Sequence, residues 1–254
     1  MNAATIQVAI EKRVARIRLD RPPLNILNTA MMRELDAAIA AAAPAADLFI
    51  FQGAGKKGFS AGAEVGEHSP ERAAEMLAAF HGIFRRLNKT ECITVAAVHG
   101  WCLGGGCELA LFCDFLLATE SAVFGLPEIK LGAAPPVAMV LLPRLAGMRT
   151  AADMILTGRK VNAIEAHARG LTTRLLPDDG LEAGVRTLAE ELNALSPAVL
   201  KLARQELGRR RGFDFERELQ AVEAFYLERL LRTHDAAEGI QAFLEKRTPE
   251  WQGR

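Results

Sequence analysis

The sequence has no excess of charge of either sign and no long hydrophobic run. Its 31 Lys and Arg residues are balanced by 31 Asp and Glu residues over 254 positions, so no overall field attracts nucleic acid or an anionic membrane. No run of about 18 apolar residues is present, so no transmembrane helix is predicted. The first ten residues lack the apolar core of a secretory signal. Half of the residues are hydrophobic, and we expect a globular protein of the cytoplasm.

Cysteine and histidine are scarce, and neither suggests a metal site. The four cysteines are Cys92, Cys102, Cys107 and Cys113. Cys107 and Cys113 are six positions apart and would lie on different faces of a helix, so we expect reduced, mostly buried cysteines and no metal. The five histidines are not clustered, and surface or core roles are favoured for each. Only His68 and His81 are worth testing, because they flank a predicted helix that begins at residues 69–71 and could line a pocket.

Two common phosphate-binding motifs are also missing. There is no Gly-x-x-x-x-Gly-Lys-Ser/Thr, and no Gly-x-Gly-x-x-Gly with an acidic partner after a second strand. The chain has instead a glycine turn between a predicted strand and a predicted helix. An apolar run at residues 93–98 precedes three glycines at 104–106, and Cys-Glu-Leu-Ala-Leu at 107–111 suits a helix.

This glycine turn has two readings. It is either a tight connection or a place that binds negative charge, because glycines admit a ligand closely and the first N–H groups of a helix lack intrahelical partners. A second segment, Phe-Ser-Ala-Gly-Ala-Glu at 59–64, follows an apolar strand at 48–51 and offers another N–H donor at Ala61. Glu108 lies in the first turn of the helix and can point at the same place. The two segments together favour a binding site.

Segments along almost the whole chain match one family in order and spacing. They are Arg-Pro-Pro-Leu-Asn-Ile-Leu at 21–27, residues 59–64, residues 97–114 and Phe-Gly-Leu-Pro-Glu-Ile at 124–129, followed by shorter pieces at 156–158, 163–166, 170–171 and 243–247. With them the chain resembles the enoyl-CoA hydratase/isomerase family, also called the crotonase family. The resemblance implies an α/β fold, with a crotonase-type spiral of ββα units at 1–195 that binds acyl-CoA. It also implies a C-terminal helical trimerisation region at 196–254, whose helices cover a neighbouring active site.

The resemblance also implies the chemistry. The family acts on acyl thioesters through an enolate, whose oxygen is stabilised by two backbone N–H groups, here those of Ala61 and Gly105. Two glutamates that position water and move a proton match Glu108 and Glu128. Taken singly, Glu108 is better explained as a charge at a helix start and Glu128 as a surface acid in a turn, but together they predict catalysis. Which one is acid and which is base stays open. Coenzyme A is part of the substrate, and no separate cofactor is expected.

Further residues match positions that bind the substrate in the family. Pro23 and Leu24 would lie along the adenosine, Lys246 would reach a coenzyme A phosphate, and Phe243 would lie near the adenine. The other predicted contacts are Ala61, Gly62, Ala63, Glu64, Gly104, Gly105, Pro135 and Pro136. Three arginines at 209–211 are interpreted as a solvated helix end.

The chain departs from the family pattern after Glu128. Where most members have a glycine-rich turn, this sequence has Pro135, Pro136, Val137 and Met139, and proline stiffens a turn. We therefore expect a rigid, apolar acyl pocket that accepts a compact ring better than a straight fatty acyl chain. The stretch at 60–68, with the two prolines, resembles the cyclohexa-1,5-dienecarbonyl-CoA hydratases of anaerobic aromatic degradation.

Three functions are weighed. Hydration of an α,β-unsaturated or cyclic dienoyl-CoA leads, because isomerases commonly manage with one acid and this chain has two candidate glutamates. Another crotonase-type reaction, isomerisation or ring-opening hydrolysis of an acyl-CoA, is the alternative. A silent acyl-CoA- or RNA-binding scaffold is disfavoured by the balanced charge. We expect an acyl-CoA as the partner, and a homo-oligomer, either a trimer or a dimer of trimers. The apolar residues that suggest an oligomer are those of the helical tail, at Phe215, Leu219, Phe225 and Leu230.

Overall fold

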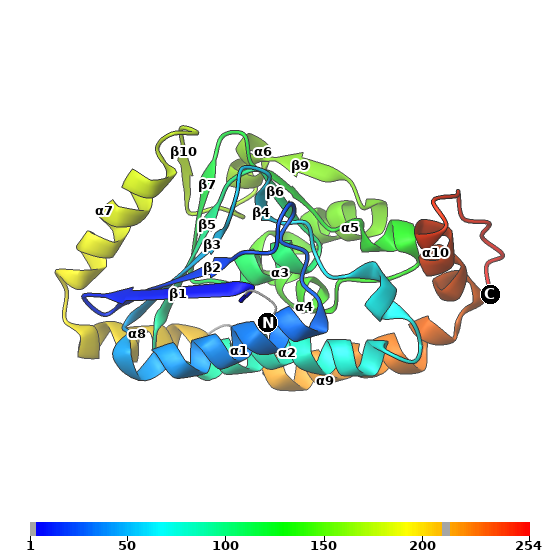
Figure 1. Cartoon of the computed structure of the whole chain (residues 1–254), viewed down its shortest axis with the longest axis horizontal. Helices are drawn as coiled ribbons and strands as arrows, with labels where there is room; N and C mark the ends of the chain where they lie inside the picture. The colour runs from blue at the N-terminus through cyan, green and yellow to red at the C-terminus, as the bar shows by residue number, and fades with distance from the viewer. Residues whose placement is uncertain (1–3, 210–213) are drawn as a thin grey trace.

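Between residues 48 and 125 the chain adds strands to two sheets in alternation (Figure 1). The structure is a computed structural model that describes residues 4–209 and 214–254, so two of the three arginines at 209–211 lie outside the described residues. Within that part, a six-stranded sheet has the order β1-β2-β3-β5-β7-β10, and a four-stranded sheet has the order β4-β6-β8-β9. β3, β5 and β7 each precede a strand of the smaller sheet and then a helical segment. This alternation is the predicted spiral of ββα units.

The sheets are mostly parallel, and only the pairs β1–β2 and β8–β9 are antiparallel. The strands are β1 (Ile6–Glu11), β2 (Val14–Leu19), β3 (Leu48–Gly53), β4 (Gly58–Ser60), β5 (Ile93–Val98), β6 (Trp101–Leu103), β7 (Phe115–Thr119), β8 (Val123–Gly125), β9 (Lys160–Asn162) and β10 (Arg174–Leu176). Every residue of β5 is buried, because a parallel strand has its two faces covered by other elements. This explains why its sequence is a continuous apolar run.

Helices cover the outside of the sheets. They are α1 (Thr29–Ala42), α2 (Ala73–Lys89), α3 (Gly105–Phe112), α4 (Pro136–Leu145), α5 (Gly147–Thr157), α6 (Ala163–Ala168), α7 (Leu181–Asn193), α8 (Pro197–Arg209), α9 (Phe215–Glu228) and α10 (His234–Leu244), with 3₁₀ turns η1 (Ala43–Ala45), η2 (Val65–His68), η3 (Pro127–Leu131) and η4 (Leu230–Arg232). The sequence offers Asn28 or Thr29 as the cap of a helix that runs to about Ala43. α1 begins there, because the Asn28 side chain accepts from the Met31 N–H at 2.9 Å and caps the helix. α2 begins later than predicted, since Ser69 and the residues after it form a turn first.

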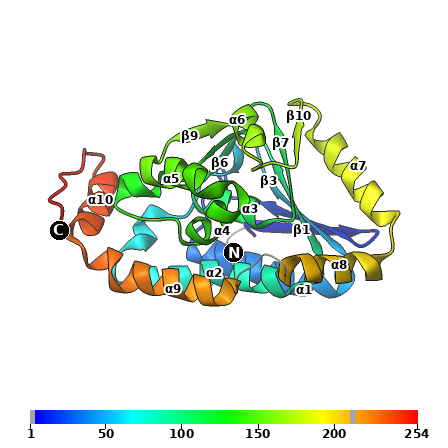
Figure 2. The same ribbon diagram turned by 180° about the vertical axis from the view of Figure 1, so that it is seen from behind.

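The C-terminal helices pack on the body of their own chain. α9 lies beside α2, as both views show (Figures 1 and 2). Phe215 and Leu219 are buried in the main core, and Phe225 and Leu230 pack partly buried against it. These four residues are therefore covered, fully or in part, by their own chain, and they do not support the predicted oligomer. α10 contacts η2 and η3 of the same chain, so this helix covers its own chain rather than only a neighbour.

Two further predictions can be compared with the structure. All four cysteines are free, and three of them, Cys92, Cys102 and Cys107, are buried, as expected. No helix in residues 4–209 and 214–254 is both long and apolar enough to span a bilayer.

Candidate active site

The three glycines at the start of α3 bring distant segments together. Gly104 has φ of +51°, and a Cβ built there would lie 2.8 Å from Glu128 Oε1, so a side chain would be strained and would also displace the carboxylate. A Cβ on Gly106 would lie 2.6 Å from the Ser60 Cβ. The turn therefore lets the segment at 59–64 and the η3 carboxylate approach the first turn of α3.

A cavity of about 70 Å³ lies at this meeting point. Eight predicted site residues line it: Ala61, Gly62, Ala63, Gly104, Gly105, Glu108, Glu128 and Pro136. The remaining lining residues are Val65, His68, Met76, Leu77, Phe80, Pro127, Leu131, Ala133, Ala134 and Ile240. Two carboxyl groups and two segments with backbone N–H groups thus share one small, mostly apolar space.

The backbone donors of this cavity differ from the prediction at one position. The Ala61 N–H donates to the Leu24 carbonyl at 2.9 Å, so it is not available to a ligand, and its prediction as an oxyanion donor was wrong. The Ala63 N–H has no acceptor in the described part of the chain. A Cβ on the intervening Gly62 would lie 3.6 Å from the Gly105 nitrogen. The two N–H groups that remain for one ligand atom are therefore those of Ala63 and Gly105, the latter in the unpaired first turn of α3.

Glu108 is held by the beginning of α4. Its side chain is 2% exposed, and its Oε1 accepts from the Ala138 N–H at 2.9 Å. Pro136 stands at the first position of the helix, where proline is favoured because that N–H would be unpaired. Burial raises the pKa of Glu108 to about 7, and the backbone N–H groups of Ala138 and Val137 oppose that rise by stabilising the carboxylate.

Glu128 lacks this support. It lies in η3 beside Gly104, and its Oε2 is shut off from solvent with no hydrogen-bond partner in the described structure. Burial and then the charge of Glu108 raise the pKa of Glu128 to about 8. Two nearby carboxyl groups in unlike surroundings separate into one that ionises more easily and one that keeps its proton.

Several predicted contacts lie outside the cavity. Pro23 is exposed, and the Leu24 carbonyl accepts from the Ala61 N–H. Pro135 stands at the N-cap of α4, Val137 is fully buried, and Met139 packs against the core. Phe243, near the end of α10, and Lys246, just beyond it, are both exposed. Glu64 forms an ion pair with Arg21 at 3.3 Å. The closing wall was therefore only partly predicted, because it is made by Pro136 with Ala133 and Ala134 and not by Val137 or Met139.

Sequence reasoning missed residues that come from the far end of the chain. Ile240 of α10 lines the cavity. Tyr226 of α9 is fully buried behind it, and its hydroxyl lies 2.7 Å from His68 Nδ1. His81, in contrast, lies outside the cavity and pairs with Glu223 at 2.6 Å. No local pattern marks Tyr226, because its role depends on how α9 packs against α2 and η2.

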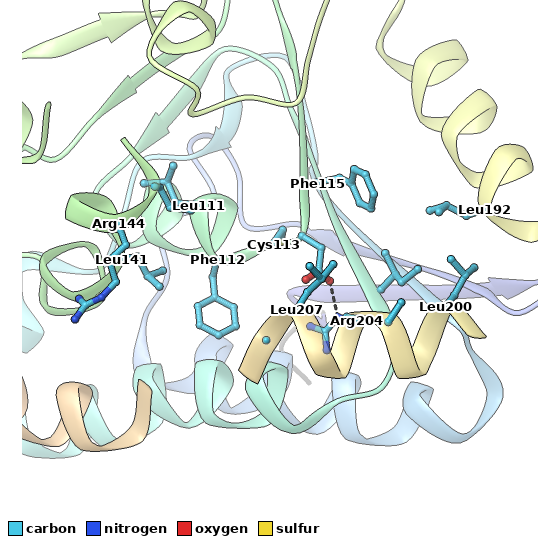
Figure 3. Close-up of a pocket in the computed structure, with 15 residues that line it drawn as sticks. Leu111, Phe112, Cys113, Phe115, Leu141, Arg144, Leu192, Leu200, Arg204 and Leu207 are labelled. Atoms are coloured by element: carbon cyan, nitrogen blue, oxygen red, sulfur yellow. Dashed lines mark hydrogen bonds and ion pairs between the residues drawn. The ribbon is translucent and has the colours of Figure 1, made fainter. Parts of the chain in front are cut away.

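A larger cavity lies elsewhere but offers no comparable chemistry. It measures about 450 Å³ and lies beside α8, lined largely by apolar side chains such as Leu141, Leu200 and Leu207 (Figure 3). Its Arg204 is already paired with Asp114 at 2.6 Å and with the Thr90 carbonyl. The smaller cavity remains the candidate active site.

Comparison with known proteins identifies the family of this chain. A family model described as enoyl-CoA hydratase/isomerase matches residues 9–254. The chain belongs to that family. It is 38% identical to a cyclohexa-1,5-dienecarbonyl-CoA hydratase of Thauera aromatica, over 94% of this chain and 93% of the relative. It is 36% identical to a 2,3-dehydroadipyl-CoA hydratase of Escherichia coli, over 97% and 98%.

A solved structure confirms the predicted fold. An enoyl-CoA hydratase from Mycobacterium avium subsp. paratuberculosis superposes with a TM-score of 0.89 at 28% identity, over 99% of this chain and 100% of that one. The family resemblance and the α/β spiral predicted from the sequence are thus both confirmed.

Proposed function

We propose that this chain is a hydro-lyase that adds water to the double bond of a compact α,β-unsaturated acyl-CoA, and that a cyclic dienoyl-CoA is its best substrate. The observation that carries the proposal is the pair of buried carboxyl groups, Glu108 and Glu128, in unlike surroundings around one cavity. Hydration needs a base for water and an acid for carbon, and such a pair supplies both.

The thioester oxygen would lie between the N–H groups of Ala63 and Gly105. As the enolate forms, negative charge develops on that oxygen, and preorganised donors stabilise the charge more than they stabilise the ground state. One donor of this kind lowers the activation barrier by about 2.7–4 kcal/mol. The start of α3 adds the favourable end of its dipole.

The carboxyl groups divide the proton transfers by their environments. Glu108 receives the Ala138 N–H on Oε1, which favours its carboxylate and leaves Oε2 to take a proton from water. Glu128 has an unpartnered oxygen and a like charge beside it, which favours its protonated form as the donor to carbon. We therefore assign Glu108 as the base and Glu128 as the acid.

The cavity also limits the acyl group. Its small volume and the wall at Pro136, Ala133 and Ala134 favour a compact group over a long chain, and a rigid ring loses little entropy on binding. No Lys or Arg is among the described residues that line it. A second carboxylate, as in the dehydroadipyl group named for the E. coli relative, would face two glutamates without a cation. The Thauera relative is named for a cyclic dienoyl group, which agrees with the cavity.

The coenzyme A portion would run outward from the cavity along residues that remain predictions. Pro23 and Leu24 are on a loop whose Leu24 carbonyl accepts from the Ala61 N–H, and this link to the cavity supports the predicted contact of the loop with the adenosine end of coenzyme A. Phe243 and Lys246 follow Ile240, which lines the cavity. We retain all four as coenzyme A contacts. Replacing Lys246 with Met should raise KM without changing kcat, if it binds a phosphate.

We further propose a trimer or a dimer of trimers, with residues 196–254 contributing to the contact. Support comes from α8, where Val199, Leu202 and Leu207 are between 63% and 72% exposed and form apolar surface that water does not favour. Light scattering that gives a mass of 27.5 kDa, the mass of one chain, at micromolar concentration would refute this.

The experiment that tests the function is a panel of acyl-CoAs scored for water addition by mass. It should include cyclohexa-1,5-dienecarbonyl-CoA, crotonyl-CoA and longer 2-enoyl-CoAs in one competition reaction. Among these hydrocarbon thioesters, we expect the cyclic dienoyl thioester to have the highest kcat/KM. A steady rise of kcat/KM with linear chain length, with the ring ignored, would show a fatty enoyl-CoA hydratase instead. No water addition to any member would reject hydration.

A further inference from the structure

One polar pair in the wall of the cavity has no part in the proposed reaction. His68 ends η2 and lines the cavity, and its Nδ1 lies 2.7 Å from the hydroxyl of Tyr226, which α9 brings from 158 positions further along the chain. Tyr226 is fully buried. Apart from the two glutamates, every other side chain that lines the cavity in the described structure is apolar. A histidine in such an apolar wall suggests a function, because burying a polar group there without a hydrogen-bond partner costs free energy.

The proton positions in this pair follow from its surroundings. Burial lowers the pKa of His68 to about 4, so the ring is neutral near pH 7 and carries one N–H. Burial raises the pKa of Tyr226, with added effects from the charges of Glu128 and Glu108, so its O–H is intact. The Tyr226 hydroxyl has no other partner in the described structure, and it therefore donates to Nδ1. The proton of His68 is then on Nε2.

The Nε2–H group is neither paired within the described structure nor sealed from its surroundings. In the described part of the chain, only His81 Nε2 and Glu128 Oε2 are side-chain polar atoms sealed from solvent without a partner. His68 Nε2 also lacks a protein partner. Because it is not one of these two sealed atoms, it must be accessible. Since His68 lines the cavity, the N–H is presented to whatever binds there.

We propose that His68, with its tautomer fixed by Tyr226, is a specificity-determining residue that selects compact acyl groups carrying a neutral oxygen, a hydroxyl or a keto group, away from the thioester. The inference rests on the proposed function for the identity of the ligand as an acyl-CoA. A hydrocarbon group would bury the Nε2–H without a partner, whereas an oxygen acceptor would satisfy it. Sites built around such a bond discriminate strongly against analogues that lack the acceptor. A neutral imidazole beside two glutamates offers no comparable advantage to a carboxylate.

Binding of unreactive saturated thioesters tests this without requiring turnover. The probes are cyclohexanecarbonyl-CoA and its 3-hydroxy and 4-hydroxy derivatives, titrated calorimetrically into the full-length wild-type protein. We expect at least one hydroxy derivative to bind about tenfold more tightly than the hydrocarbon, as one hydrogen bond of typical strength allows.

Variants separate a hydrogen bond from a structural role. His68→Leu should abolish the preference while it binds the hydrocarbon as well as the wild type does. His68→Gln, which keeps an N–H donor, should restore part of the preference, and Tyr226→Phe should reduce it because the tautomer is no longer fixed. His81→Gln is the matched control, since His81 is buried and paired but does not line the cavity, and it should leave the ratio unchanged.

Two results would overturn the inference: a wild type without preference for either hydroxy derivative, or a preference that persists in His68→Leu. Both are independent of whether water is added to an enoyl-CoA. A protein that hydrates enoyl-CoAs but shows no preference would retain the proposed function and lose this inference. A protein that shows the preference but hydrates no enoyl-CoA would retain this inference and lose the proposed function.

Discussion

Two cavities of this molecule differ in hydrogen bonding as well as in size. The larger one beside α8 holds about 450 Å³, and its charged residues are paired, Arg204 with Asp114 and Arg144 with Glu218. The smaller one holds about 70 Å³ and contains a carboxylate oxygen without a partner, on Glu128. Evolution of a stable core removes such groups, and they persist where a ligand or a reaction uses them. Of these two cavities, the smaller one is therefore the better candidate active site, because it holds the unsatisfied carboxylate oxygen of Glu128.

The comparison is tested most severely by removing the charged groups of each cavity. Glu108→Gln and Glu128→Gln should each lower kcat by at least ~10²-fold, the low end for the loss of an acid or a base. The double variant should be little worse than the worse single one, because the pair acts on one water as a unit.

Arg204→Met in the larger cavity is the control for that experiment. It leaves Asp114 without its guanidinium partner in a mostly buried place, so it should lower the melting temperature by several degrees. Its kcat should stay within about twofold of wild type at a temperature where the variant is folded. Near-wild-type kcat in either glutamate variant would refute the assignment of the smaller cavity.

The glycine turn gives a second test, with a smaller expected effect. Gly104→Ala should lower kcat at least tenfold, because the new methyl group lies against Glu128 Oε1 and shifts the acid. Gly147→Ala is a matched control, since Gly147 also has positive φ, at +81°, but has no atom within 4 Å of its Cβ position. Because φ is positive at both positions, both variants carry backbone strain, and equal losses of kcat would mean that strain and not Glu128 explains the effect.

The pH dependence of kcat/KM should reflect the different surroundings of the two carboxyl groups. The base must be ionised, so activity should rise with pH through the pKa of Glu108, about 7. The acid must be protonated, so activity should fall as pH rises through the pKa of Glu128, about 8. We expect a narrow bell with its maximum between these values and about tenfold loss per pH unit on each side. A flat profile from pH 6 to pH 9 would contradict the division of roles.

The sequence predicted those parts of the fold and site that local pattern determines. Asn28 caps α1, and the run at 93–98 is a buried strand, because capping and hydrophobicity act over a few residues. Glu108 and the three glycines were also placed correctly in the turn before and within α3. Whether the Ala61 or the Ala63 N–H is free could not be predicted, since it depends on the Leu24 carbonyl across a loop. Tyr226 was missed for the same reason, because its partner His68 is distant in sequence.

The smallest expected effect concerns stability and has the opposite sign to the effect on activity. The pKa of Glu128 is raised in the folded state, from 4.5 to about 8, so between these values the folded chain binds more protons than the unfolded chain. Stability therefore falls as pH rises through that window. Glu128→Gln removes the ionisation, and at pH 8 the inactive variant should melt at least ~2 °C above wild type, a shift that corresponds to at least about 0.5–1 kcal/mol for a domain of this size. At pH 5 the carboxyl group is protonated in the wild-type fold, so the two melting temperatures should converge. Calorimetry at both pH values measures the difference, and a variant that is less stable than wild type at pH 8 would show that Glu128 supports the fold rather than straining it for catalysis.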